Sequence, residues 1–357
     1  MTYRVGILGA TGAVGQTFVQ LLDGHPWFEI TALAASERSA GKTYREAANW
    51  LAGDPMPEAV ANMVVESTAP PLDCDLVFSG LSSSVAGEVE RAFAAAGYPV
   101  ISNAKNYRMA ADVPLLIPEV NPDHIGLLDH QDRGAGFIVT NPNCSTVGLV
   151  CALRPLQDAF SVETVQVTTL QALSGAGYPG VSALDALGNV IPYIGGEEDK
   201  LATEPKKLLG RLAGDRIEPA ALTVSAQCTR VPVRDGHLET ISVKLARPAT
   251  PGDVSDAFEA FVSPLAEMNL PSAPETFIEV CDDERFPQPH RHVQRGGGMT
   301  VSVGRIRACE VLDVKFVSLV HNTVRGAAGG AVLNAELLAE QGYLKTREAA
   351  PANAASA

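Results

Sequence analysis

The sequence lacks any apolar run of the roughly 18 residues that a membrane-spanning helix requires. Its N-terminus enters an apolar strand at once, without the charged region and apolar core of a secretion signal. Its six cysteines, at positions 74, 144, 151, 228, 281 and 309, include no Cys-x-x-Cys pair and no Cys/His cluster at zinc spacing. We therefore expect free thiols, no metal site, no membrane association and a cytoplasmic, reducing location.

Basic residues are also scarce. The chain has 27 Lys and Arg against 41 Asp and Glu, which gives a formal net charge of −14. This balance argues against a nucleic-acid surface, although a local basic pocket could still hold a small phosphorylated ligand. With 357 residues, of which 46% are hydrophobic, the chain has room for two domains or for one large domain with an insert.

A glycine-rich turn follows the first predicted strand, which covers residues 3–8, and leads directly into a helical segment. In such a turn Gly9 permits the tight bend, Gly12 lets backbone N–H groups approach a pyrophosphate, and Gly15 lets the helix pack close to the strand. The spacing is G-x-x-G-x-x-G rather than G-x-G-x-x-G, but its place after the first strand favours a dinucleotide site. The expected contacts are Gly9, Thr11, Gly12, Ala13, Val14 and Gly15.

The end of the second predicted strand, residues 29–35, indicates which dinucleotide binds. An NAD site should carry an acidic residue there for the ribose hydroxyls. This chain instead supplies hydroxyls and cations, which suit a 2′-phosphate, so we expect NADP; Glu37 is the counter-argument, and a polar surface loop is the alternative. The expected phosphate contacts are Ser36, Arg38, Ser39 and Lys42.

Strands and helices alternate through the first part of the chain, which predicts an α/β, Rossmann-type, doubly wound parallel sheet. Ser82 follows the strand at 75–80 and should face the cofactor. Beyond residue 146 the strands are rich in β-branched residues and predict an α+β catalytic domain whose exposed sheet face could pair subunits. We expect a nucleotide-binding domain at 1–145, completed by a C-terminal helix at 325–345, and a catalytic and dimerisation domain at 146–324. A flexible tail is expected at 346–357. Within the domains we expect helices at 44–51 and 197–212 and a strand at 63–65.

Cys144 lies where a predicted strand, residues 136–140, meets a predicted helix. Unpaired N–H groups and the helix macrodipole favour an anion at a helix N-terminus, so we expect a depressed thiol pKa and a nucleophilic sulfur. The alternative is that Cys144 is one more small buried hydrophobe.

A thiolate nucleophile requires a partner that handles protons, and His237 follows a tight turn in the second domain. Taken alone, such a histidine is more often structural. Arg230, seven residues earlier, could hold a substrate carboxylate bidentately. Glu204 and Lys207 share a helix face at i, i+3, where the simplest interpretation is a surface ion pair.

These residues carry a resemblance to the aspartate-β-semialdehyde dehydrogenase family, most closely to its archaeal and fungal branch. The resemblance covers residues 3–342. It depends on the motifs Gly9-Ala10-Thr11-Gly12, Ala34-Ala35-Ser36-Glu37-Arg38-Ser39, Ile117-Pro118-Glu119-Val120-Asn121, Thr140-Asn141-Pro142-Asn143-Cys144-Ser145, Gln171-Ala172-Leu173-Ser174-Gly175-Ala176-Gly177, Arg230, His237 and His321-Asn322-Thr323-Val324-Arg325-Gly326-Ala327-Ala328-Gly329.

The resemblance implies NADPH-dependent reductive dephosphorylation of L-4-aspartyl phosphate to aspartate semialdehyde through a Cys144 thioester, in the pathway to lysine, threonine and methionine. It also implies a homodimer or homotetramer. The implied roles are Cys144 as nucleophile, His237 as acid/base, Gln171 orienting the substrate, Arg230 with Glu204 on the substrate's carboxylate and amine, Arg108 with Lys207 on phosphate, and Asn322 near the nicotinamide. The segment Ala104-Lys105-Asn106 before Tyr107 departs from the family pattern, which often has small or hydroxyl residues there, so no role is assigned to Lys105.

Two other functions remain open. An acyl-CoA reductase, notably malonyl-CoA reductase, resembles the same branch, but Asn143 and the Glu204/Lys207 pair favour the amino-acid phosphate. A catalytically dead NADP-sensing module should lack the nucleophile or the base, whereas this chain has both Cys144 and His237.

Overall fold

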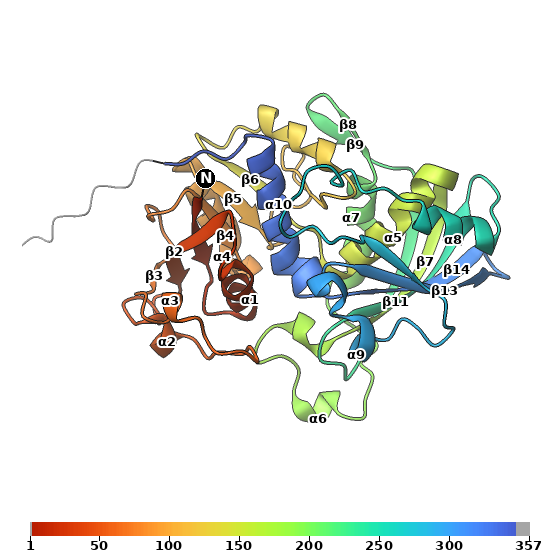
Figure 1. The fold of residues 1–357 in the computed structure, drawn as a ribbon, viewed down its shortest axis with the longest axis horizontal. Helices are drawn as coiled ribbons and strands as arrows, with labels where there is room; N and C mark the ends of the chain where they lie inside the picture. The colour runs from red at the N-terminus through yellow and green to blue at the C-terminus, as the bar shows by residue number, and fades with distance from the viewer. Residues whose placement is uncertain (1, 348–357) are drawn as a thin grey trace, which may run out of the picture.

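The computed structural model describes residues 2–347, whose strands form two six-stranded sheets and one two-stranded hairpin (Figure 1). The first sheet is entirely parallel and has the order β3-β2-β1-β4-β5-β6, the arrangement of a doubly wound dinucleotide-binding fold. Its strands are β1 (Tyr3–Leu8), β2 (Phe28–Ala35), β3 (Glu66–Ser67), β4 (Leu76–Ser79), β5 (Pro99–Ser102) and β6 (Phe137–Thr140). The helices of this half include α1 (Ala13–Leu22), α2 (Tyr44–Ala47), α3 (Glu58–Ala61), α4 (Ser83–Ala95), the 3-10 helix η1 (Pro122–His130) and α10 (Gly329–Glu340).

The second sheet is mixed and has the order β10-β7-β11-β14-β13-β12. Its strands are β7 (Val162–Gln171), β10 (Thr223–Arg230), β11 (His237–Leu245), β12 (Ile278–Cys281), β13 (Val301–Ala308) and β14 (Val314–Val320). The other elements of this half are α5 (Cys144–Phe160), α6 (Ala183–Ala186), α7 (Glu197–Leu208), α8 (Pro251–Glu259), α9 (Pro289–His292), the hairpin strands β8 (Arg211–Ala213) and β9 (Arg216–Glu218), and the 3-10 helices η2 (Leu173–Ala176) and η3 (Arg295–Gly298).

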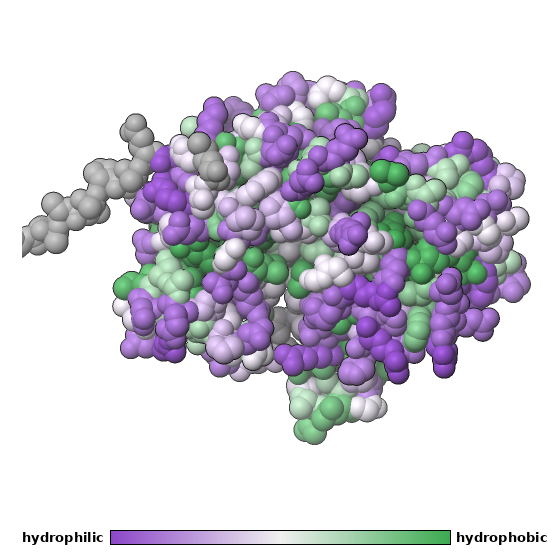
Figure 2. Space-filling view, viewed as in Figure 1, coloured by the Kyte–Doolittle hydropathy of each residue, from purple (hydrophilic) through white to green (hydrophobic). Residues whose placement is uncertain are grey.

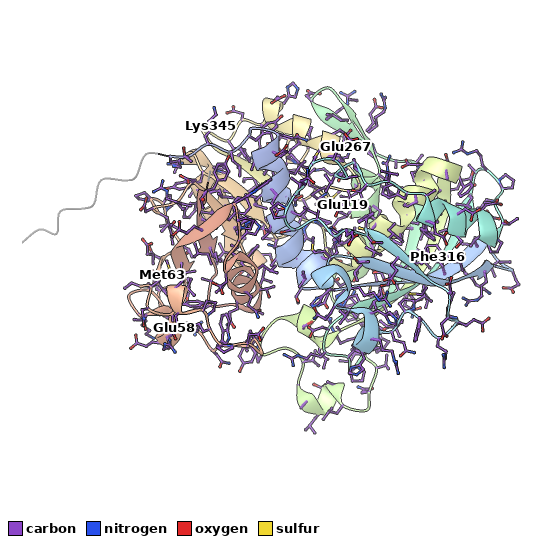
Figure 3. All side chains as sticks on the ribbon, in the orientation of Figure 1. Glu58, Met63, Glu119, Glu267, Phe316 and Lys345 are labelled. Carbon is purple, nitrogen blue, oxygen red and sulfur yellow. The ribbon has the colours of Figure 1, made fainter. Side chains whose placement is uncertain are left out.

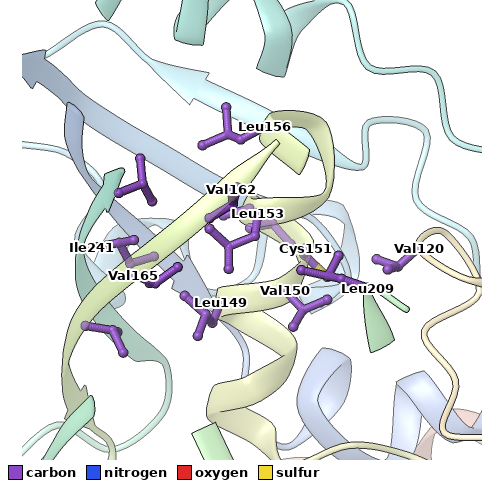
Figure 4. Close-up of a cluster of buried hydrophobic side chains, with 14 of the residues drawn as sticks. Val120, Leu149, Val150, Cys151, Leu153, Leu156, Val162, Val165, Leu209 and Ile241 are labelled. Atoms are coloured by element: carbon purple, nitrogen blue, oxygen red, sulfur yellow. The ribbon is translucent and has the colours of Figure 1, made fainter. Parts of the chain in front are cut away.

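Helix α5 fixes the position of the candidate site because it is buried along most of its length. Leu149, Leu153 and Leu156 are fully buried and belong to one cluster with Val165 of β7 and Ile241 of β11 (Figure 4). Burial of each such side chain contributes about 1.5–3 kcal/mol, so the sheet holds α5 and its first residue firmly. Among residues 2–347 no helix is both long and apolar enough to cross a bilayer.

A buried ion pair joins the two halves. Arg325 donates from both terminal nitrogens to Glu119, at 3.0 and 2.6 Å, and both side chains are about 1% exposed. Glu119 is labelled near the middle of Figure 3, between the two sheets. Arg325 belongs to a π-helical turn, η4 (Val324–Ala328), that precedes α10, and Gly326 of this turn lies against Cys144. The turn therefore brings the C-terminal helix to the start of α5.

Several expected boundaries are wrong. The helix expected at 44–51 ends at Ala47, because the Leu51 N–H donates to the buried Gln16 side chain and draws the chain away. The strand expected at 63–65 is instead β3, Glu66–Ser67. The helix expected at 197–212 ends at Leu208, and the hairpin β8–β9 follows it.

Arg347 falls within the segment that was expected to be a flexible tail, 346–357, but two contacts hold it. The Arg347 N–H donates to Asp75 at 2.7 Å, and its guanidinium lies 3.8 Å from the centre of the Tyr98 ring. These contacts fix Arg347 to the first sheet. The rest of the expected tail, 348–357, lies outside the described residues.

Candidate active site

Cys144 is the first residue of α5 and is half-buried. Asn143 caps this helix, because its side-chain oxygen accepts from the N–H groups of Ser145 and Thr146 at 3.0 and 3.3 Å. The Asn143 N–H donates to Glu204 at 2.7 Å. The predicted strand-to-helix junction is therefore present, and buried polar groups hold it from both sides.

His237 supplies the nearest ring nitrogen to this sulfur. Its Nε2 lies 3.2 Å from Cys144 Sγ, and the histidine is fully buried. His237 opens β11, which runs antiparallel to β7 with Leu238 opposite Leu170, so His237 and Gln171 lie at the same end of the two strands. Arg230 pairs with Gln171 across β10 and β7. The sheet thus brings together residues that are far apart in the sequence.

The sequence analysis missed two residues of this cluster, Glu197 and Lys200, both in α7. Glu197 accepts from Asn143 Nδ2 at 2.9 and 3.1 Å and from Gln171 Nε2 at 3.4 Å, and it is paired with Lys200. The signal that could have found them is a Glu-x-x-Lys spacing, which occurs at 197–200 and again two turns later at 204–207. Because both pairs face the same way along the helix, the pattern alone does not distinguish them.

The electrostatics of Cys144 differ from the expectation. Burial, helped by the neighbouring Glu197 carboxylate, raises the pKa of the thiol to about 12. Cations at Arg108, Lys200 and Arg230 act in the opposite direction without reversing the shift. The predicted depression of this pKa is therefore wrong. The helix N-terminus is already capped by Asn143, and an acidic side chain lies beside the sulfur.

His237 is shifted toward its neutral form. Burial lowers the pKa of its imidazole to about 3, and the charge of Arg230 and the ring of His321 act in the same direction. A thiol and an imidazole shifted in this way face each other as neutral groups.

Glu204 and Lys207 do not form the surface ion pair considered above. Both are buried, at 2% and 7% exposure. Glu204 accepts from Arg108 Nη1 at 3.0 Å as well as from Asn143. The Lys207 ammonium donates to three carbonyls, those of Arg108, Ala110 and Val113, at 2.7–2.8 Å. These bonds hold the loop that carries Arg108. Since an ammonium has three donors, Lys207 has none left for a ligand.

The carboxyl edge of the first sheet carries the glycine turn. Gly9 has a φ of +81°, and a Cβ on Gly15 would lie only 2.2 Å from the Gly9 carbonyl oxygen. Gly12 is the N-cap of α1 and offers no side chain to fill the helix N-terminus. These features fit a dinucleotide phosphate, which binds backbone N–H groups at such a position. Gly80, at the end of β4, packs against Gly9 and Val14 and was not predicted.

The other predicted cofactor contacts lie around this edge with fewer constraints. Ser36, Arg38 and Lys42 are exposed after β2, while Ser39 is half-buried in the same turn. Thr11 and Ala13 lie in the turn and at the start of α1, and Ser82 is exposed as the N-cap of α4. Asn322 lies on the catalytic side: it accepts from the Gly236 N–H at 2.8 Å and donates to Ser174 Oγ at 2.8 Å.

Comparison with known proteins assigns the family. Residues 4–128 match the family model "Semialdehyde dehydrogenase, NAD binding domain", and residues 153–325 match "Semialdehyde dehydrogenase, dimerisation domain". The aspartate-semialdehyde dehydrogenase of Archaeoglobus fulgidus is 50% identical over 345 residues, which cover 96% of this chain and 99% of that protein.

Solved structures agree with this result. The Candida albicans aspartate semialdehyde dehydrogenase with NADP is 46% identical, with a TM-score of 0.90, over 96% of this chain and 100% of that chain. The Vibrio cholerae aspartate semialdehyde dehydrogenase II complexed with ASA is 28% identical, with a TM-score of 0.76, over the same shares of the two chains. The expected resemblance to the archaeal and fungal branch is confirmed, and the chain belongs to the aspartate-semialdehyde dehydrogenase family.

Proposed function

We propose that this protein is an NADP-dependent aspartate-semialdehyde dehydrogenase that converts L-4-aspartyl phosphate and NADPH to aspartate semialdehyde and phosphate. The observation that carries the proposal is the 3.2 Å approach of Cys144 Sγ and His237 Nε2 at the start of a buried helix, beside Gln171 and Arg230. A sulfur in this position can displace phosphate from an acyl phosphate and form a thioester. Bound NADPH would supply the hydride that reduces this thioester.

Arg230 and Glu197 are the proposed contacts for the substrate's carboxylate and amine. Arg230 is 7% exposed, and its charge acts on the Cys144 thiol. We assign the amine to Glu197 rather than to Glu204, because Glu204 is occupied by Arg108 and by the Asn143 N–H. Glu197 instead contacts Asn143 and Gln171, and it is one of the charges that act on the sulfur.

For phosphate we propose Arg108 together with Lys200. The Arg108 guanidinium donates to Glu204 and to the Asn103 carbonyl, and its remaining N–H groups can still donate to a ligand. Its Nε is buried and has no hydrogen-bond partner among the described residues. Lys200 replaces Lys207 in this role because all three donors of Lys207 are bound to carbonyls. The two proposed cations also act on the Cys144 thiol.

We propose that NADP binds along the carboxyl edge of the first sheet. The glycine turn at Gly9–Gly15 would hold the pyrophosphate, and Ser36, Arg38, Ser39 and Lys42 would hold the 2′-phosphate. Asn322 would face the nicotinamide, because it already ties together the loops beside His237. In this division residues 1–145 with the C-terminal helix bind most of the cofactor and supply Arg108 to the phosphate. Residues 146–324 supply the other proposed substrate contacts, Asn322 and the surface for a second subunit.

We propose a homodimer formed by the second sheet. Helices α5 and α8 cover one of its faces, whereas the other carries exposed polar residues such as Gln166, Gln227 and Thr240. The α6 arm, residues 178–193, leaves the body and shows apolar side chains at its tip (Figure 2), with Leu184 92% and Leu187 73% exposed. Apolar groups this exposed are expected to pack against a partner. Sedimentation velocity tests the dimer and would also detect a tetramer.

One assay tests the activity. Aspartate semialdehyde oxidation is followed by NADPH formation, with phosphate varied in one series and coenzyme A in another. The proposal expects saturation by phosphate, replacement of phosphate by arsenate, and indifference to coenzyme A. Saturation by coenzyme A without need for phosphate would assign an acyl-CoA reductase, and inactivity in both series would assign a nucleotide-binding protein without catalysis.

A further inference from the structure

The Glu204 carboxylate bridges two parts of the site. Its Oε1 accepts from Arg108 Nη1 at 3.0 Å, and its Oε2 accepts from the Asn143 N–H at 2.7 Å. Arg108 lies in the loop after β5, whereas Asn143 is the N-cap of α5 and directly precedes Cys144. One planar carboxylate therefore joins the proposed phosphate cation to the helix that carries the nucleophile.

This bridge is shielded from water. Glu204, Arg108 and Asn143 are each more than nine-tenths buried. Solvent screens such an ion pair little, and each buried charge depends on its partner. The Arg108 guanidinium also donates to the Asn103 carbonyl at 2.7 Å. The rotamer freedom of the arginine is thus lost in the folded protein, before phosphate binds.

The bridge leaves part of the guanidinium available to a ligand. Of its five N–H donors, one bonds to Glu204 and one to the Asn103 carbonyl, and the Nε is buried without a partner among the described residues. The charges of Arg108 and Lys200 both act on the Cys144 thiol. A phosphate held by these two cations would therefore lie near the sulfur that carries the thioester.

The charge of Glu204 by itself opposes phosphate binding. A carboxylate beside Arg108 weakens the attraction of this cation for an anion. The arrangement favours the reaction only if the attack depends on a fixed position of Arg108 relative to Cys144. Enzyme reactions are this sensitive, because a misplacement of about 1 Å can slow a step by roughly 10²-fold.

We propose that Glu204 is a positioning residue that fixes Arg108 against the first turn of α5, so that phosphate is held within reach of a thioester on Cys144. This inference rests on the proposed function. Glu204 does not touch the substrate in this account and acts on phosphate only through Arg108. The role differs from the amine contact that the family resemblance implies for Glu204.

The proposed reaction has two halves, and only the second needs phosphate. In the first half His237 takes the Cys144 proton, the sulfur bonds to the aldehyde carbon, and hydride leaves that carbon for NADP⁺. This half gives a thioester and NADPH, and the proton passes from His237 to solvent. In the second half an oxygen of hydrogen phosphate bonds to the thioester carbon, the carbon–sulfur bond breaks with its electron pair on sulfur, and the phosphate proton returns to Cys144 through His237. Misplacement of Arg108 should therefore slow the second half and spare the first.

Rapid mixing and steady-state kinetics of the full-length enzyme separate the two halves. Without phosphate, NADP⁺ and aspartate semialdehyde should give one burst of NADPH, whose rate reports the first half. The KM for phosphate in steady turnover reports the second half. Glu204→Gln keeps the length of the side chain but has only one acceptor oxygen, and Glu204→Asp keeps the charge but is too short to reach both donors.

We expect each Glu204 variant to raise the KM for phosphate by roughly 10- to 100-fold, the value of a charge-assisted hydrogen bond, and to leave the burst rate within about threefold. Glu218→Gln is the matched control, because Glu218 also pairs with an arginine, Arg211, but both side chains are exposed. This control should change neither quantity.

Three results would overturn the proposal. If Glu204 acted only through its charge, Glu204→Gln would lower the KM for phosphate, because Arg108 would regain its full attraction for an anion. If Glu204 bound the substrate amine, the variants would raise the KM for aspartate semialdehyde and slow the burst, with the KM for phosphate unchanged. A merely structural role would give equal losses in both halves.

The double variant Arg108→Ala/Glu204→Gln tests the same claim without leaving a buried charge unpaired. Because Glu204 acts on phosphate through Arg108, we expect the double variant to have the same KM for phosphate as Arg108→Ala alone. A further increase of about tenfold, the value of an independent charge-assisted contact, would overturn the proposal. If the unchanged protein gave neither a burst nor turnover with phosphate, the proposed function itself would be wrong.

Discussion

The two ligand-binding regions of this molecule are built differently. Around Cys144 the functional side chains are buried and bonded to one another: His237 is fully buried, Gln171 is 1% exposed, and Glu204 is 2% exposed. At the nucleotide edge the glycine turn provides backbone groups, and Ser36 and Arg38 point into solvent. The catalytic region is held by tertiary contacts between distant segments, whereas the nucleotide region is formed by one local turn and the loop after the next strand.

This difference predicts how each region responds to substitution. In the catalytic region a lost side chain leaves a buried partner without its hydrogen bond, so function and stability should change together unless the residue contacts only the ligand. In the nucleotide region an exposed side chain can be removed with little effect on stability. The following experiments test this contrast, from the largest expected effect to the smallest.

Cys144→Ala should abolish turnover, because no other group supplies the acyl acceptor that forms the thioester. NADP binding, measured by fluorescence quenching or calorimetry, should remain, since the cofactor region is separate. Cys281→Ala is the matched control, because Cys281 lies at the far end of the second sheet on β12 and should retain activity. Near-normal turnover by Cys144→Ala would remove the basis of the mechanism.

Two lysines two helical turns apart should behave in opposite ways. Lys200→Met should weaken phosphate binding by roughly 10- to 100-fold, the value of a charge-assisted hydrogen bond. It should lower the free energy of unfolding less than Lys207→Met does, because Glu197 keeps its hydrogen bonds from Asn143 and Gln171. Lys207→Met should instead lower the free energy of unfolding by about 1–3 kcal/mol, because buried carbonyls lose their donor. Phosphate titrations and urea unfolding of both variants provide the comparison. A Lys207 variant of normal stability with a selective phosphate defect would return the phosphate role to Lys207.

Arg38→Ala should narrow the preference for NADP over NAD by roughly tenfold or more, since a charged contact to the 2′-phosphate is lost. Stability should not change, because Arg38 is exposed. The control is Arg45→Ala, another exposed arginine of the first domain, paired with Glu58 at 3.0 Å. The measurement is kcat/KM with each cofactor. An unmodified enzyme that uses both cofactors equally would contradict the assignment to NADP.

The last experiment concerns stability alone, at Glu239, which lies two residues beyond His237 on β11. Glu239 is fully buried, and neither carboxylate oxygen has a hydrogen-bond partner among the described residues. Burial raises its pKa well above the ordinary value of 4.5, so the folded protein keeps the proton that the unfolded chain releases. The stability contributed by this proton is complete below the unfolded pKa and declines as pH rises toward the folded pKa.

Glu239→Gln should therefore gain stability relative to the unchanged protein as pH rises from 5 to 8, by up to about 1.4 kcal/mol per pH unit. Urea unfolding across this range measures the difference in free energy of unfolding between the variant and the unchanged protein. Glu163→Gln, at an exposed position on β7, is the control, and its difference should not change with pH. If the difference for Glu239→Gln stays constant with pH, Glu239 is ionised in the folded protein.

The sequence predicted the fold of the nucleotide region well because its determinants are local. The glycine spacing, the strand before it and the helix after it follow one another in about 20 residues, and the parallel sheet follows from alternating elements. The Cys144 junction was predicted for the same reason, since strand, cap and helix are contiguous.

The catalytic region was predicted less completely because its details depend on contacts between distant segments. Whether Glu197 or Glu204 is available to the substrate amine depends on how each turn of α7 meets Asn143. An i, i+3 spacing in the sequence cannot decide this. The pKa of Cys144 depends on burial and on Glu197, whereas the sequence offered only the helix dipole. The contact between Arg108 and Glu204 joins segments 96 residues apart.

Peptide mass spectrometry of the acyl-enzyme tests the central claim most directly. The enzyme is mixed with NADP⁺ and aspartate semialdehyde in the absence of phosphate, then quenched in acid and digested. We predict an aspartyl adduct on the peptide that contains Cys144, its loss when phosphate is added, and no adduct in Cys144→Ala. An enzyme that turns over with phosphate but never carries this adduct, or an adduct discharged by coenzyme A and not by phosphate, would contradict the account.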